Sequence, residues 1–487
     1  MRKLSLILCL LATPALAGSV DVGGYFRVAA RPDFQGGDGA LGYWNLYGRL
    51  MNERSYGLLD LRLGVLDAEP GSGESWASAH ARIEGGSIAG ADSGNGRLDN
   101  LRLSQVYVRA GNVGTGNVVW QVGTIDWYMG DLGLYDFRPA NIFSESVGVS
   151  GRIDTERLEL VFGVGDAGFT MHPDRYNTVL TPGGTARLRL GKLELGGGGQ
   201  LYLEPKVVGK ASAPHATPDI DYADLVRGEL AEHWVEENPG EQDLFPDPQP
   251  RSASSFKVFG YVGVGGVGPV TWNSLYVSYR RLHPGSMLTE TYDGRNYDIY
   301  LTDVSDERYQ LEIADELQLR VVPNKLDVTW AAYLSSHTDA DNDVSPSDHE
   351  RLVMSTVLRG QIYMTPVVHL LVEGSLASET SGNGNRYRNR KDSIFHNTAG
   401  TVDSQGLEFG DSDVRRTAQL KGGLVLNPLG PGIFTRPSLR LLYGVQHSSQ
   451  NNAFGNNFVV TPDQNNDFDT VERHLHHLVS IETEVWL

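Results

Sequence analysis

The sequence predicts an all-β protein, a transmembrane antiparallel up-and-down β-barrel of about 18 strands with long external loops. Three observations predict this fold. The chain opens with a segment typical of an export signal. It closes with an amphipathic strand that reaches the last residue, and short and long connections alternate between the other strands.

Residues 1–17 have the three parts of a secretory signal peptide. Arg2 and Lys3 form the charged part, residues 4–12 form the apolar part, and residues 15–17 form a small-residue cleavage motif. The mature protein is then a single barrel domain over residues 18–487. Cys9 is the one cysteine of the sequence. It leaves with the signal, so we expect no disulfide.

Composition narrows the class of protein without deciding it. The chain is 40% hydrophobic, and no later segment offers the roughly 20 consecutive apolar residues that a membrane helix needs. The formal net charge of −19 argues against nucleic acid as a partner, because the phosphates would be repelled. These features fit strands that are apolar on one face only. They fit a soluble, acidic, exported β protein equally well.

The lengths of the connections favour the barrel. An outer-membrane barrel has tight turns at its periplasmic end and long loops outside, whereas a soluble sandwich has no reason to place long loops at every second connection. Short connections lie near residues 154–156, 191–192, 265–269, 323–325, 365–366 and 427–432. Long polar stretches cover residues 166–182, 204–253, 281–308, 338–349, 379–412 and 449–472.

The strand count follows from these connections. Strands are predicted to begin near residues 20, 45, 76, 99, 117, 147, 157, 183, 193, 254, 269, 309, 326, 350, 367, 413, 435 and 473. Residues 45–66 are taken as one long strand, although a turn at Asn52–Ser55 would split it and make the count odd. An even count returns the C-terminus to the periplasmic side.

Polar side chains share one face of the predicted strands. In residues 475–487, Glu482, Glu484 and Trp486 lie on the parity opposite to apolar residues such as Ile481. An arginine facing lipid at mid-depth would cost about 2–4 kcal/mol and an acid somewhat less, so the polar parity is predicted to face a water-filled lumen. Asp315 falls on the outer parity and is the exception.

Six segments share features with one known family: residues 20–27, 47–49, 59–64, 131–137, 436–441 and 484–487. In their order along the chain they resemble the maltoporin family of sugar-specific outer-membrane channels. The resemblance implies a homotrimer of 18-stranded barrels. It also implies that residues 131–137 belong to an inward-folded third loop.

The resemblance further implies two rows of residues along the pore. The aromatic row would hold the apolar faces of sugar rings, and the ionic row would exchange hydrogen bonds with their hydroxyl groups. By position, the aromatic row comprises Tyr25, Phe434, Trp486 and Trp272. The ionic row comprises Arg27, Arg49, Asp60 and Asp136. Taken singly, each of these residues has a plainer explanation as an interfacial aromatic or a solvated wall residue.

Arg138 departs from the family pattern, which has a pore-narrowing tyrosine at this position. We expect Arg138 and Asp136 to face each other across the constriction and to set its selectivity. An arginine at this position extends the range of expected solutes from sugars to other polar or anionic molecules.

Metal and catalytic motifs are weak. Residues 339–350 resemble a calcium loop, but Val344 occupies the position that needs glycine, so a solvated external loop is the better interpretation. His474 and His476 share a strand face but lack further ligands for zinc. The acidic stretch 219–247 is read as a long external loop. We find no catalytic motif, and we expect no enzyme, cofactor or metal site.

The predicted function is facilitated diffusion of carbohydrates and ions across a bacterial outer membrane, with outer-membrane lipid and a small hydrophilic solute as partners. One alternative is a general diffusion porin that admits small hydrophilic or anionic solutes. A barrel enzyme with a triad assembled from separate strands is the alternative from another class.

Overall fold

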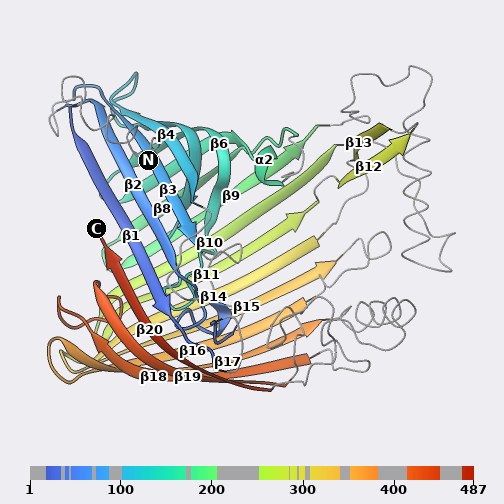
Figure 1. The fold of residues 1–487 in the computed structure, drawn as a ribbon. Helices are drawn as coiled ribbons and strands as arrows, with labels where there is room; N and C mark the ends of the chain where they lie inside the picture. The colour runs from blue at the N-terminus through green and yellow to red at the C-terminus, as the bar shows by residue number, and fades with distance from the viewer. Residues whose placement is uncertain are drawn as a thin grey trace, which may run out of the picture.

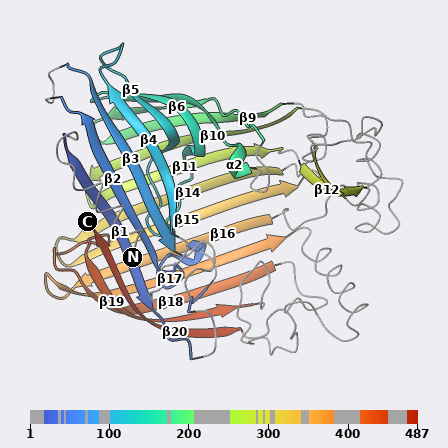
Figure 2. The same ribbon diagram turned by 45° about the horizontal axis from the view of Figure 1, so that its top comes forward.

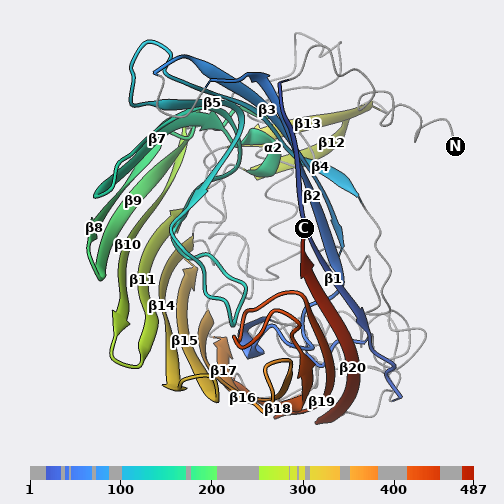
Figure 3. The ribbon, with the colours of Figure 1, turned by 90° about the vertical axis from the view of Figure 1, so that its left-hand side faces the viewer.

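The computed structural model describes residues 18–34, 39–42, 45–68, 73–86, 101–171, 177–205, 252–283, 286–292, 295–301, 308–339, 351–381, 414–449 and 474–487. Within these ranges, 18 strands form one sheet that closes on itself (Figures 1 and 3). The strands of the barrel are β1 (Val20–Ala30), β2 (Tyr56–Leu66), β3 (Trp76–Gly86), β4 (Arg102–Gly111), β5 (Val119–Tyr128), β6 (Asn141–Asp154), β7 (Leu158–Asp166), β8 (Gly183–Leu190), β9 (Leu193–Glu204), β10 (Ala253–Val267), β11 (Val270–Leu282), β14 (Arg308–Val322), β15 (Leu326–Asp339), β16 (Arg351–Tyr363), β17 (Val368–Ser381), β18 (Val414–Leu426), β19 (Ser438–Ser448) and β20 (Leu475–Trp486).

Every strand of the barrel pairs antiparallel with its neighbours in the chain, and β1 pairs with β20 to close the ring. In that seam Tyr25 lies opposite Trp486, and Arg27 lies opposite Glu484. Figure 3 shows β1 and β20 side by side although they stand at the two ends of the sequence. Closure removes the free sheet edges that would otherwise invite pairing with other chains. The predicted fold class is therefore confirmed.

Burial alternates along the strands because the two faces of the wall meet different surroundings. In β19, Ser438 and Arg440 point into the barrel and are buried, whereas Leu439, Leu441 and Tyr443 point outward and are exposed. The outer face of the described strands is mainly apolar, as the alternation in the sequence predicts. None of the helices in the described ranges is long and apolar enough to cross a membrane.

Asp315, in the middle of β14, is the acidic exception on the outer face. The Asn273 side chain on β11 donates a hydrogen bond to its carboxylate at 2.7 Å. The two residues lie diagonally across the β11–β14 pair, since Asn273 is opposite Leu317 and Asp315 is opposite Leu275. A neighbouring amide therefore satisfies part of the hydrogen-bonding capacity of this outward carboxylate.

The prediction of one long strand over residues 45–66 is wrong. The strand begins only at Tyr56, and Asn45–Tyr47 form a short 3-10 helix, η1. The segment before β2 turns into the barrel, where Leu41, Leu50 and Met51 are buried. The number of strands remains 18 because this segment adds no strand to the wall.

Other boundaries also differ from the prediction. The strand predicted from residue 147 begins at Asn141. A hairpin of β12 (Ser286–Tyr292) and β13 (Arg295–Leu301) occupies most of the long stretch predicted between residues 281 and 308. It lies beyond the ends of the neighbouring barrel strands (Figure 2). The short helix α2 (Gly168–Met171) follows β7. The signal peptide 1–17, the acidic stretch 219–247 and most of the calcium-like segment 339–350 lie outside the described residues.

The connection between β5 and β6, residues 129–140, folds into the barrel, which confirms the inward-folded third loop. Leu132, Leu134 and Tyr135 are completely buried there. The Leu134 amide donates to the Glu316 carboxylate on β14 at 2.9 Å, and the Tyr135 hydroxyl donates to the Ala331 carbonyl on β15 at 3.3 Å. Because β5 and β6 stand on the other side of the ring from β14 and β15, the loop crosses the lumen (Figure 3).

Candidate functional site: the constriction of the barrel

Two inward segments meet inside the barrel and define a constriction. We call residues 31–55 the first loop and residues 129–140 the third loop. The Arg49 amide of the first loop donates to the Leu134 carbonyl of the third loop at 2.8 Å. Each loop is also bonded to the barrel wall, so the two hold each other in place.

A buried charge cluster on β16–β18 fixes the first loop. Lys421 donates to the backbone carbonyls of Tyr47 at 2.9 Å and Gly48 at 3.1 Å. Its ammonium group also pairs with Glu373 at 2.9 Å, and Glu373 pairs with Arg359 at 2.5 Å. These charged side chains are almost fully shielded from solvent. Lys421 thus holds the loop, and the pairing of its charge with Glu373 makes its burial tolerable.

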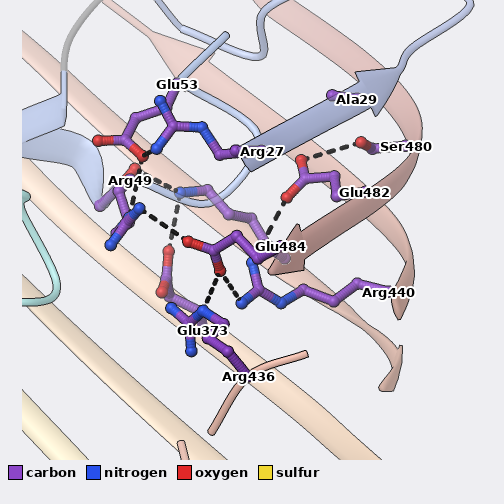
Figure 4. A network of polar contacts seen from close by, with 12 residues as sticks. Arg27, Ala29, Arg49, Glu53, Glu373, Arg436, Arg440, Ser480, Glu482 and Glu484 are labelled. Atoms are coloured by element: carbon purple, nitrogen blue, oxygen red, sulfur yellow. Dashed lines mark hydrogen bonds and ion pairs between the residues drawn. The ribbon is translucent and has the colours of Figure 1, made fainter. Parts of the chain in front are cut away.

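A second cluster centres on Glu484 of β20 (Figure 4). Its carboxylate pairs with Arg49 at 3.0 Å, Arg436 at 2.8 Å and Arg440. The Tyr25 hydroxyl donates a hydrogen bond to the same carboxylate. One buried acid thus joins the first loop, the connection before β19, β19 itself and β1.

Glu482 extends this cluster along the same strand face (Figure 4). Its carboxylate pairs with Arg31 at 2.7 Å and lies 3.8 Å from Arg440. The Ser480 hydroxyl donates to it at 2.9 Å. The inward-facing acids of the last strand are therefore paired with arginines inside the barrel.

Glu53 and Asp136 share two arginines where the loops meet. Glu53 pairs with Arg27 and, at 2.9 Å, with Arg49. The Asp136 carboxylate lies 3.9 Å from the guanidinium groups of both arginines, and its side chain is 44% exposed. Asp136 has a φ of 53°, a left-handed conformation that few residues other than glycine adopt. The fold thus accepts an unusual backbone at this point of the constriction.

The two carboxyl groups have opposite pKa shifts. Burial raises the pKa of Glu53 to about 7, against the opposing charges of Arg27 and Arg49. Burial would also raise the pKa of Asp136, but Arg49, a hydrogen bond with Glu53 and Arg27 together lower it. Near neutral pH Glu53 is therefore partly protonated, whereas Asp136 is ionised.

Four predicted site residues come together here: Tyr25, Arg27, Arg49 and Asp136. Trp486 lies beside them at the end of β20, with its ring centroid 4.6 Å from that of Tyr25. Trp486 is 62% exposed, whereas Tyr25 is buried beneath the ion pairs. Only Trp486 of this pair can offer a free ring face to a solute.

Phe434 and Trp272 pack on the third-loop side of the constriction, apart from Tyr25 and Trp486. Phe434 comes from the connection between β18 and β19, and its ring packs against Gly133 of the third loop. Trp272 lies on the inner face of β11 and packs against the same apolar cluster. Within the described ranges, no ring contact joins either residue to Tyr25 or Trp486. The predicted aromatic row is therefore interrupted.

Asp60 stands apart from the network, and Arg138 acts on it only at a distance, by helping to lower the pKa of Asp136. Asp60 on β2 forms a two-point ion pair with Arg82 on β3, at 2.7 and 3.2 Å. The Arg138 guanidinium lies over the Tyr128 ring, 3.9 Å from its centroid. Arg138 stands on the same loop as Asp136, so the expectation that they face each other across the constriction is wrong. Asp136 faces the two arginines of β1 and the first loop instead.

Sequence reasoning missed most partners in the network. Glu53, Arg436, Arg440, Glu482 and Glu484 lie in or beside segments that the resemblance covers, yet only their pairing reveals a role. For Glu482 and Glu484 the sequence did contain a signal, because strand alternation places both on the same inner face as Trp486. Within the described ranges, no group of three or more metal-binding side chains is present.

The wall opposite these loops is open to solvent. Inward-facing side chains on β2–β4 remain accessible from one end of the barrel to the other: the exposed fractions are 57% for Arg102, 46% for Asp60 and 49% for Arg62. On β17 and β18, Glu373 and Lys421 are fully buried by the first loop. A solute entering the barrel therefore meets the β2–β4 wall and the exposed edges of the two loops.

No protein-family model matches the chain, and no curated protein matches it. Solved structures do. The match to the outer membrane channel DcaP of Acinetobacter baumannii has 10% identity and a TM-score of 0.47, and covers 98% of this chain and 99% of that chain. The match to the anion-selective porin from Comamonas acidovorans has 10% identity and a TM-score of 0.38, and covers 96% of this chain and 99% of that chain. The match to Pseudomonas aeruginosa OccK11 (OpdR) has 10% identity and a TM-score of 0.40, and covers 96% of this chain and 96% of that chain. The barrel assignment rests on the strand pairing of this chain.

Proposed function

We propose that the protein is a passive channel of the bacterial outer membrane that admits small hydrophilic solutes and prefers anions. The closed barrel with an apolar outer face and a polar inner face carries this proposal. Such a wall suits lipid outside and water inside, because each strand is hydrogen-bonded to a neighbour on both sides and the closed ring leaves no free sheet edge.

The preference for anions rests on the charges around the constriction. Five guanidinium groups meet four carboxylates there, and one of those carboxylates, that of Glu53, is partly protonated near neutral pH. The group as a whole is positive. An excess of positive charge beside a narrow aqueous path raises the local concentration of anions.

Planar-bilayer recording of the purified protein tests this function. We expect step-like ohmic conductance and a reversal potential in a KCl gradient that shows chloride to be more permeant than potassium. Absence of conductance from folded protein would refute the channel. A cation-selective conductance would refute the anion preference alone.

A carbohydrate channel is the second candidate, and the exposed ring of Trp486 beside Tyr25 favours it. Liposome swelling with a series of sugars separates the two candidates. Dependence on size alone supports the general channel. Faster entry of oligosaccharides, with saturable block that Trp486→Ala removes, would support the specific one. The maltoporin resemblance and the homotrimer remain predictions, and light scattering of the detergent complex tests the trimer.

A further inference from the structure

Lys257 and Arg280 form a like-charge pair on the inner wall. They lie directly opposite each other in the β10–β11 ladder, at the loop-bearing end of the barrel. Directly opposed residues of an antiparallel pair have Cβ atoms about 4.5–5.5 Å apart, and like charges there destabilise the sheet. Within the described part of the chain, neither residue forms an ion pair.

The nearest acid, Glu312, attracts both cations but forms no ion pair with either of them within the described residues. Glu312 of β14 lies one row further in, and its oxygens accept hydrogen bonds from the Ser278 hydroxyl at 2.9 Å and the Tyr333 hydroxyl at 2.7 Å. The Lys257 ammonium donates to the Asn141 side chain, which is neutral. Lys257 and Arg280 therefore bring two positive charges against the single negative charge of Glu312.

Two buried donors in the same row lack hydrogen-bond partners. The Arg280 Nε is buried and has no hydrogen-bond partner, and neither has Nε2 of Gln200. Gln200 of β9 lies directly opposite Lys257, and Gln310 of β14 lies directly opposite Arg280. Native structures leave few buried donors unpaired, so two in one row, beside cations that form no ion pair, indicate a missing acceptor.

We propose that Lys257 and Arg280, with Gln200, form a binding subsite for a carboxylate group of a small solute, on the entry side of the constriction. A guanidinium group and an ammonium group flanking one carboxylate would supply the two-point and single-point bonds that such a group accepts. The subsite would load an anion before it reaches Arg27 and Arg49. The role of this subsite in transport rests on the proposed function, whereas the binding of a carboxylate at it does not.

Equilibrium dialysis of radiolabelled succinate against the folded protein in detergent micelles tests the subsite. We expect Arg280→Gln and Lys257→Gln each to weaken succinate binding at least tenfold, and Arg280→Lys to restore part of it. The matched control is Arg102→Gln on β4, an inward arginine at the same end of the barrel that already pairs with Glu84 at 2.9 Å. It should leave binding unchanged. Heat-modifiable gel mobility verifies that each variant is folded.

Each result then decides the matter. Equal binding in wild type and both variants, or no binding in wild type, overturns the subsite. Displacement of succinate by inorganic phosphate supports it and extends the ligand to oxyanions in general. A protein that binds succinate through these residues but conducts no ions would refute the channel and leave the subsite standing.

Discussion

Arg49 lies 3.0 Å from Glu484, and this ion pair joins the first loop to the last strand of the barrel. The contact matters because Glu484 also neutralises Arg436 and Arg440. The conformation of the constriction therefore depends on one buried carboxylate.

Glu484→Gln should destabilise the barrel by about 3–5 kcal/mol, because it leaves buried guanidinium groups without a counter-charge. Urea unfolding in lipid vesicles measures the change. The matched control is Glu194→Gln on β9, whose partly exposed carboxylate lies 3.7 Å from Arg187. It should cost under about 1 kcal/mol. Equal effects of the two changes would contradict a central role for Glu484.

The raised pKa of Glu53 predicts a pH-dependent selectivity. The pKa of Glu53 in the folded protein is about 7, above the ordinary value of 4.5, so protonation favours the folded state. This contribution to stability is complete below pH 4.5 and is lost as the pH rises through 7. The same titration adds negative charge beside Arg27 and Arg49.

We therefore expect anion selectivity to fall as the pH rises from 6 to 8. Reversal potentials measured across this range should show the change in the wild type, and Glu53→Gln should abolish it. Glu194→Gln again serves as the control. A pH dependence that survives in Glu53→Gln would assign the titration to another group.

Gly133 leaves room for the Phe434 ring. A Cβ atom at this position would lie 2.9 Å from two ring carbons, so Gly133→Ala should strain the third loop by about 1–3 kcal/mol. Phe434→Ala should relieve part of that strain in the double variant. Melting temperatures of the four proteins measure the coupling. Additive losses would mean that the ring and the glycine are not in contact.

The Asn273–Asp315 pair predicts a stability change on the outer face. Asn273→Ala should destabilise the barrel by about 1 kcal/mol, because it removes a hydrogen bond from a carboxylate that faces outward. Replacing both residues by leucine should be neutral or stabilising. Urea unfolding in lipid vesicles checks both. A neutral Asn273→Ala would show that Asp315 finds another partner.

The wall of the barrel could be predicted because alternation is a local property of each strand. The course of the first loop could not, since residues 45–55 carry enough apolar side chains to pass for a strand. Their path is decided by Lys421, which lies far along the sequence and bonds the carbonyls of Tyr47 and Gly48.

The candidate site was predictable only in part. Tyr25, Arg27, Arg49 and Asp136 could be placed by resemblance, but the acids that pair with the arginines depend on three separate segments meeting. The position of Lys257 opposite Arg280 likewise depends on the exact register of β10 and β11, which no local pattern specifies.

The seam between β1 and β20 has a consequence for biogenesis. Tyr25 and Arg27 emerge near the start of synthesis, yet the acid that satisfies Tyr25 stands 459 residues later. Until that last strand arrives, the arginines of the first loop and of β19 lack their common counter-ion and β1 has an unpaired edge. The Glu484 carboxylate thus stabilises both the constriction and the closed barrel. An incomplete barrel, which lacks β20, therefore cannot form the complete constriction.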